Sequence, residues 1–276
     1  MPNSKYPKRN TLMNDKYFDV NKDSWNRRLS VHVESKFYDN ESFIRGKNSL
    51  NEPELDLLGN VDGLDLLHLQ CHFGQDSISL SRIGAVVTGV DISDTSIAYA
   101  QQLAARCSEN VEFICSNVID YRPMRDYDLV FTSYGTIIWL PDLKPWAEVI
   151  AKSLKPGGKF VIVDFHPFLY VFDDGLENLQ YDYFNTGAIV EKVSGTYTEN
   201  STEEVFDSVT WNHSMSEIIN ALISVGLSVE AFDEYDFSPY NCFPGMKEVA
   251  PRKYIFNHQK ISFPLTYGIV AKRPES

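Results

Sequence analysis

The segment between residues 64 and 93, LDLLHLQCHFGQDSISLSRIGAVVTGVDIS, contains side chains that could bind a nucleotide. An apolar run leads into a turn that contains Gly74, and a second apolar run ends in Asp91, 91 − 74 = 17 residues further along the chain. Ligands bind at the carboxyl ends of such strands, where an acid accepts hydrogen bonds from the two hydroxyls of a ribose. The alternative is that Asp91 only caps a helix that starts near Ser93.

The turn itself, HLQCHFGQ, is poor in glycine. Gly74 is therefore expected to provide an unusual backbone angle or a close approach to the ligand. The helix that follows points its free N–H groups and the positive end of its dipole at the crevice. The G-x-G-x-x-G fingerprint of dinucleotide-binding proteins is absent, which removes the main support for a dinucleotide.

The order of the predicted elements explains how these residues come together. Short apolar runs alternate with helical segments as far as residue 166, which favours a mostly parallel sheet with helices on both faces. The expected strands are 64–70, 85–92, 111–118, 127–135 and 159–166, and the expected helices are 75–84, 96–107 and 142–158. After residue 166 we expect a helix over 216–227 and strands over 228–237 and 265–273.

Two segments do not follow this alternation. Residues 1–20 resemble a loose tail and residues 21–60 a set of short helices, so residues 1–60 are predicted to form an N-terminal tail and helical cap. Residues 61–276 are the main domain, in which residues 168–212 form a β-rich, aromatic, lid-like insertion. The alternative is that its aromatic side chains only pack the insertion on the core.

The composition narrows the possible partners. The chain of 276 residues has a net charge of −13, which disfavours nucleic acid because phosphate binding needs a basic face. Its four cysteines show no CxxC spacing, so we expect no metal site. The N-terminus has charge without an apolar run, and no stretch is long enough for a membrane span. A cytoplasmic protein without a membrane or nucleic-acid partner is therefore expected.

Several of these residues resemble one known family. Residues 68–74, His-Leu-Gln-Cys-His-Phe-Gly, stand where class I S-adenosylmethionine-dependent methyltransferases commonly carry D-x-G-x-G-x-G. Asp91 matches the ribose-binding acid of the family, Asn117 matches a residue near the adenine, and LKPGGKFVIVD matches the turn into the fifth strand. The resemblance covers residues 60–166 well, and residues 265–273 fit the final strand of the family.

The resemblance implies both a fold and a cofactor. The implied α/β fold is a Rossmann-like, doubly wound, mostly parallel seven-stranded sheet whose last strand is antiparallel, together with the N-terminal cap and the insertion. The implied cofactor is S-adenosyl-L-methionine, its product S-adenosyl-L-homocysteine, and the acceptor a small molecule. The residues that it assigns to the cofactor are His68, Gln70, Cys71, His72, Phe73, Gly74, Asp91, Ile92, Asn117, Val118, Ser133 and Tyr134.

The first motif departs from the family at three positions. His68 takes the place of the acid that ends the strand, and it cannot oppose the ammonium group of the cofactor as a carboxylate does. Gln70 and His72 replace the first two glycines, so their side chains either clash with the ligand or replace backbone contacts with side-chain ones. A purely structural role is the alternative for both histidines.

Methyl transfer from a sulfonium mainly needs proximity and alignment, and it needs a general base only if the acceptor loses a proton. The candidate catalytic residues are Tyr134 after the fourth strand, His166 after the fifth, and His213 before the later helix. Each has a structural alternative: Tyr134 as an aromatic wall, His166 as a hydrogen-bonded loop residue and His213 as a residue at the start of a helix. Asp164 lies inside the fifth strand, so it is expected to position a neighbouring site residue and not to act on the substrate itself. The segment TSYGTIIW lacks the [DN]-P-P-[YF] tetrad of enzymes that methylate bases or amide side chains.

Three functions remain open from the sequence. The leading prediction is a methyltransferase that acts on a small molecule. The second is a protein that kept this scaffold without catalysis, as the side chains of His68, Gln70 and His72 suggest. The third, a nicotinamide-dependent oxidoreductase, is weakened by the missing G-x-G-x-x-G and by the LKPGG turn. The sequence gives neither the identity of the acceptor nor the oligomeric state.

Overall fold

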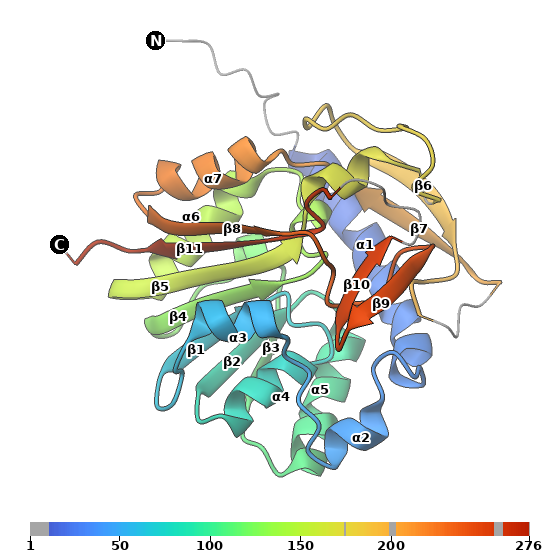
Figure 1. The fold of residues 1–276 in the computed structure, drawn as a ribbon. Helices are drawn as coiled ribbons and strands as arrows, with labels where there is room; N and C mark the ends of the chain where they lie inside the picture. The colour runs from blue at the N-terminus through green and yellow to red at the C-terminus, as the bar shows by residue number, and fades with distance from the viewer. Residues whose placement is uncertain (1–10, 174, 199–202, 257–261, 276) are drawn as a thin grey trace, which may run out of the picture.

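The computed structural model describes residues 11–173, 175–198, 203–256 and 262–275, and a seven-stranded sheet lies at its centre (Figure 1). Its strands, in spatial order, are β3 (Glu112–Cys115), β2 (Val86–Asp91), β1 (Asp65–Leu69), β4 (Tyr127–Ser133), β5 (Leu154–Phe165), β11 (Thr266–Lys272) and β8 (Ser228–Tyr235). The first five strands in this order pair in parallel, whereas β11 is antiparallel to both β5 and β8. The predicted sheet with an antiparallel last strand is therefore confirmed.

Helices cover both faces of this sheet (Figure 1). They are α1 (Thr11–Val33), α2 (Asn40–Ile44), α3 (Glu52–Leu58), α4 (Gln75–Arg82), α5 (Asp94–Cys107), α6 (Leu143–Ser153) and α7 (Met215–Ser224), with short 3-10 turns η1 (Val118–Asp120), η2 (Ile137–Trp139) and η3 (Pro167–Val171). Helix α6 ends at Ser153, before the predicted Pro-Gly-Gly turn; Leu154 is already extended, and Pro156 has no N–H to continue a helix. Among the described residues no helix is long and apolar enough to cross a lipid bilayer.

The core follows from the alternation of side chains along the strands. Leu67 and Ile162 belong to a buried cluster that they share with α6 and α7. Leu66 and Val161, their neighbours in the chain, belong to a second cluster on the other face, with α3 and α4. Both faces of the sheet are thus buried, as expected for parallel strands with helical crossovers.

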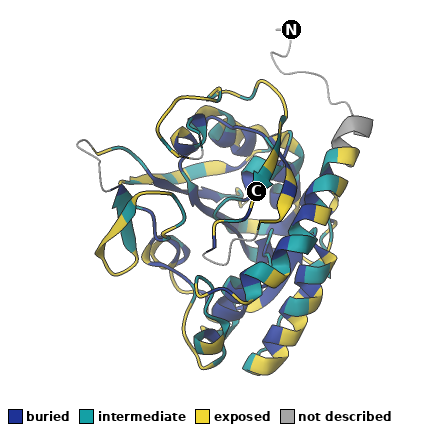
Figure 2. Ribbon diagram, turned by 90° about the vertical axis from the view of Figure 1, so that its right-hand side faces the viewer, coloured by how far each residue is buried: buried dark blue, intermediate teal, exposed yellow. Residues whose placement is uncertain are grey.

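The N-terminal segment differs from its prediction. A single helix, α1, begins at Thr11, so residues expected in a loose tail are helical, and residues 1–10 lie outside the described residues. Figure 2 shows exposed and buried residues alternating along this helix. Asn21 donates to the Val209 carbonyl at 2.7 Å and accepts from the Val209 N–H at 3.0 Å, which fixes α1 against β7 (Val205–Thr210).

The predicted insertion contains an antiparallel hairpin. Its strands are β6 (Ile189–Ser194), inside the β-like piece expected over 188–199, and β7; residues 199–202 lie outside the described residues. A second hairpin, β9 (Met246–Ala250) with β10 (Lys253–Phe256), was not predicted. Both hairpins lie near the carboxyl ends of the parallel strands (Figure 1), so they extend the walls of any site at that edge.

Candidate active site

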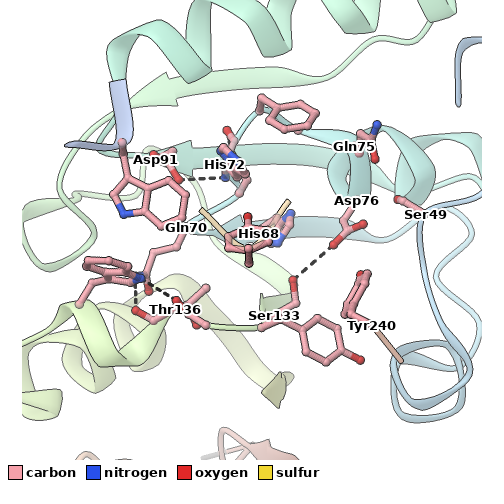
Figure 3. Close-up of a pocket in the computed structure, with 18 of the residues that line it drawn as sticks. Ser49, His68, Gln70, His72, Gln75, Asp76, Asp91, Ser133, Thr136 and Tyr240 are labelled. Carbon is pink, nitrogen blue, oxygen red and sulfur yellow. Dashed lines mark hydrogen bonds between the residues drawn. The ribbon is translucent and has the colours of Figure 1, made fainter. Parts of the chain in front are cut away.

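One cavity of about 390 Å³ lies at the carboxyl ends of β1, β2 and β4. Its size falls within the roughly 300–1,000 Å³ of small-molecule sites. All the residues that the sequence assigned to the cofactor line this cavity, namely His68, Gln70, Cys71, His72, Phe73, Gly74, Asp91, Ile92, Asn117, Val118, Ser133 and Tyr134. Figure 3 shows Asp91 and Asp76 on opposite sides of the cavity, with His68 between them.

Gly74 is the residue of the turn that no other amino acid can replace without strain. It precedes α4 with φ of 86°, in the left-handed region that favours glycine. A Cβ atom at this position would lie 2.6 Å from Cζ of Phe113 and 3.0 Å from Cβ of Ala100. The close packing of the first turn of α4 against β3 and α5 therefore requires glycine here.

Gln70 and His72 adopt the left-handed backbone of the glycines that they replace, with φ of 56° and 50°. Such angles cost a non-glycine residue roughly 1–2 kcal/mol, so other contacts must hold them. The Gln70 amide donates to the Thr136 carbonyl at 2.8 Å, and Nε2 of His72 lies 3.0 Å from Nδ1 of His32 on α1. Both side chains are thus directed at other parts of the protein, and the turn keeps the shape of a glycine-rich one.

The histidines of the turn are neutral at pH 7. Burial lowers the pKa of His68 to about 3, and it lowers the pKa of His72 well below its usual value, with the nearby His32 acting in the same direction. His68 is 2% exposed, and its Nδ1 is 2.8 Å from Oγ of Ser77. Among the described residues its Nε2 has no hydrogen-bond partner, and the side chain lines the cavity.

Asp91 is placed to accept hydrogen bonds from a ligand. Its Oδ2 accepts from the His72 N–H and its Oδ1 from the Ser93 N–H, both at 2.9 Å. The cap of α5 is Ser93, whose Oγ accepts from the Ser96 N–H, so capping of this helix does not account for Asp91. Burial raises the pKa of Asp91 to about 6, and two ribose hydroxyls would stabilise its charged form.

Apolar side chains line the cavity at the neighbouring strand ends. Ile92 follows β2, and Val118, which is 4% exposed, begins η1 after β3. Asn117 caps η1 by accepting the Ile119 N–H at 3.3 Å, and it also lines the cavity. Two aliphatic side chains beside an amide suit a purine ring.

Two acids that the sequence analysis missed lie at the opposite end of the cavity: Asp76 lines it, and Glu54 lies behind Tyr134. The Tyr134 hydroxyl donates to Oε2 of Glu54 at 2.8 Å, and the Asn51 amide donates to Oε1 at 2.9 Å. Burial and then the charge of Asp76 raise the pKa of Glu54 to about 7. Asp76 lines the cavity and accepts a hydrogen bond from Ser133 at 3.4 Å. Asp76 could have been predicted as a site residue, because it lies in the first turn of the helix that follows Gly74. The sequence around Glu54 contains no pattern that indicates a site residue.

Of the three predicted catalytic residues, Tyr134 lines the cavity, and His166 and His213 are not among the described residues that do. Nδ1 of His166 accepts from the Phe168 N–H at 3.1 Å, and its Nε2 is 3.0 Å from Glu234. Nε2 of His213 lies 2.7 Å from the Leu140 carbonyl, and its Nδ1 is 3.0 Å from Glu217. Neither imidazole lines the cavity, and each has one nitrogen hydrogen-bonded to the backbone, so the geometry favours their structural roles over the predicted base role.

Asp164 and the aromatic segments complete the walls. The carboxylate of Asp164 accepts hydrogen bonds from the Gly135 and Thr136 N–H groups, so it supports the turn after β4 as expected. Trp25 from α1 and Trp139 from η2 line the cavity with ring centroids 5.2 Å apart. The predicted cap and insertion thus supply aromatic lining, namely Phe18, Trp25, Phe37, Tyr38, Phe43, Tyr170 and Tyr197.

Comparisons with known proteins agree with this geometry. A family model described as a methyltransferase domain matches residues 66–158. A ubiquinone biosynthesis O-methyltransferase of Idiomarina loihiensis is 30% identical over 132 residues, which are 45% of this chain and 54% of that protein. Thiocyanate methyltransferase 1 of Arabidopsis thaliana is 28% identical over 94 residues, which are 33% of this chain and 41% of that protein. The matched segments span about half the length of these relatives.

A solved structure extends the likeness to the whole fold. The DhpI–SAH complex aligns with a TM-score of 0.56 at 19% identity, over 94% of this chain and 98% of that one. At this identity the match concerns the fold. Residues 66–158 thus match a methyltransferase domain, and the chain as a whole has a fold that solved S-adenosylmethionine-dependent methyltransferases share.

Proposed function

We propose that the protein binds S-adenosylmethionine in this cavity and transfers its methyl group to a small-molecule acceptor. The observation that carries the proposal is the convergence of the assigned residues on one cavity, with a half-buried acid, Asp91, at the end of β2. The cofactor supplies a methyl group on a positively charged sulfur, which a nucleophile displaces in line. The protein then needs to bind, align and exclude water.

The residues of the cavity fit the cofactor. Ile92 and Val118 offer apolar surfaces for the adenine beside Asn117, and Asp91 offers carboxylate oxygens to the ribose hydroxyls. The Nε2 of His68 is a buried polar atom whose hydrogen bonding no other described residue satisfies, and a polar ligand would satisfy it.

The side chains at the acceptor end of the cavity favour a small acceptor molecule without negative charge. Tyr134 lies there with Tyr240, their ring centroids 4.9 Å apart, and Phe165 and Phe243 continue the aromatic wall. The carboxyl group of Glu54 behind Tyr134, together with the net charge of −13, opposes an anionic acceptor and a nucleic acid. The named relatives include an O-methyltransferase and a thiocyanate methyltransferase, so their names leave the acceptor open.

A hydroxyl or amine acceptor gives up a proton as the new bond to carbon forms. The Tyr134 oxygen can take this proton while its own proton passes along the 2.8 Å hydrogen bond to the Glu54 carboxylate. The acceptor would donate a lone pair to the methyl carbon, and the sulfur would retain the electron pair of the bond that breaks. This route replaces the predicted bases His166 and His213 with Tyr134 and Glu54.

Calorimetric titration with S-adenosylmethionine, S-adenosylhomocysteine and NAD tests the proposal. We expect both sulfur compounds to bind, and Asp91→Asn to weaken them by about 10- to 100-fold, as for lost hydrogen bonds to a charged group. Asp120→Asn, which removes an exposed charge from η1, is the matched control and should not change the affinity.

Three outcomes separate the remaining possibilities. Binding of NAD in place of the sulfur compounds would reject the proposal in favour of an oxidoreductase. Binding of S-adenosylmethionine without transfer of a labelled methyl group to any component of a metabolite pool would favour a non-catalytic protein. An unchanged affinity of Asp91→Asn would reject the ribose assignment.

A further inference from the structure

The end of the cavity opposite Asp91 contains a carboxylate that lies outside the first motif. Asp76 lies in the first turn of α4 and lines the cavity. Its Oδ2 accepts a hydrogen bond from Oγ of Ser133 at 3.4 Å. Figure 3 shows it across the cavity from Asp91, with the side chain of His68 between the two acids.

A buried polar atom between the two acids has no hydrogen-bond partner among the described residues. It is Nε2 of His68, whose side chain lines the cavity. When Nδ1 of His68 carries the proton and donates it to Ser77, Nε2 is a free acceptor. Buried acceptors without partners are rare in native proteins, so this atom points to a ligand that donates hydrogen bonds.

The groups around Asp76 include one guanidinium and a second carboxyl group. Burial raises the pKa of Asp76, and a hydrogen bond with Ser49 and the positive charge of Arg252 oppose that rise. The Arg252 guanidinium, however, donates to the Ser49 and Leu50 carbonyls at 2.7 and 2.9 Å. The charge of Asp76 raises the pKa of Glu54, so a second carboxyl group lies nearby. A cation bound beside Asp76 would stabilise its charged form.

We propose that Asp76 and Nε2 of His68 bind the ammonium group at the methionine end of the cofactor. The inference rests on the proposed function, because adenine at Val118 and ribose at Asp91 leave this part of the cavity for the methionine end. An ammonium group has three N–H donors, and the carboxylate and the imidazole nitrogen are acceptors for them. A carboxylate from α4 thereby takes over from the strand-end acid that His68 replaces.

Two ligands that differ at this end provide the test. S-adenosylhomocysteine has the ammonium group, whereas 5′-methylthioadenosine has the same adenine, ribose and thioether without the amino-acid end. We expect wild-type protein to bind the first at least about tenfold more tightly, and Asp76→Asn to weaken it by about 10- to 100-fold, the usual loss for a hydrogen bond to a charge. The same substitution should leave the affinity for 5′-methylthioadenosine nearly unchanged, and Asp120→Asn should affect neither ligand.

Other results would overturn the assignment. If Asp76→Asn weakens both ligands equally, Asp76 acts on the fold of the site and not on the ammonium group. If it leaves the affinity for S-adenosylhomocysteine unchanged, Asp76 faces the acceptor instead. Wild-type protein that binds both ligands equally well would refute the inference without any variant, while the proposed function would stand. Wild-type protein that binds neither ligand would refute both.

Discussion

Glu54 provides a quantitative test of the electrostatics at the acceptor end. Its side chain is fully buried, and its pKa is raised from 4.5 to about 7 by burial and by the nearby Asp76. The hydrogen bonds from Asn51 and Tyr134 act in the opposite direction. Replacing Glu54 with Gln keeps the shape of the side chain and removes the ionisation.

The sign of the effect follows from proton binding. Between pH 4.5 and 7 the folded protein keeps a proton on Glu54 that the unfolded chain has already lost, so the free energy of unfolding falls as the pH rises. A shift from 4.5 to about 7, at 1.36 kcal/mol per unit, gives a loss of about 2–3 kcal/mol between pH 5 and pH 8. Glu54→Gln lacks this loss, so its stability relative to wild type should rise by that amount over the same range.

Urea unfolding of both proteins at several pH values from 5 to 8 measures this difference, because the contributions of all other groups largely cancel. Asp56→Asn, an exposed acid on the same helix, is the control and should give a difference that does not vary with pH. A flat difference for Glu54→Gln as well would mean that the carboxyl group is ionised normally in the folded protein. The proton route through Tyr134 would then lose its support.

Two further predictions concern the turn and the histidines. Gly74→Ala and Gly226→Ala both place a Cβ at a left-handed φ, 86° and 87°, but only Gly74 has Phe113 within 4 Å, so Gly74→Ala should lose about 1–3 kcal/mol more in thermal or urea unfolding. Equal losses would contradict the packing argument. His166→Gln and His213→Gln should keep the wild-type rate of methyl transfer, whereas a general base would cost roughly 10²–10⁴-fold. Such a loss in either variant with unchanged cofactor affinity would restore its predicted base role.

The parallel sheet and the cofactor end of the cavity were predictable because they depend on local sequence. Strands buried on both faces are continuous apolar runs, and a parallel arrangement brings all their carboxyl ends to one edge. Residues directly after such runs, including Asp91, Asn117 and Ser133, therefore meet at one cavity whatever the rest of the chain does. The position of Gly74 follows in the same way from the first strand and helix.

The cap was harder to predict because its buried face is polar. Along α1 the residues Asn21, Ser24, Arg28 and His32 are at most 6% exposed, and their spacing is helical. An analysis of apolar periodicity does not detect such a face, which depends on partners such as the backbone of β7. The burial of Glu54 could not be predicted for the same reason, since a charged residue is expected on the surface unless its partners are known.

The backbone shape of the cofactor turn has a consequence for how the protein opens. In a glycine-rich turn, left-handed angles are available to the isolated segment. Here Gln70 and His72 hold them through Thr136 and His32, which come from distant parts of the chain. If α1 detaches, His72 loses its partner and the turn can relax. The first motif and the N-terminal helix therefore belong to one cooperative unit of local unfolding, even though the β1 and α1 segments are far apart in sequence.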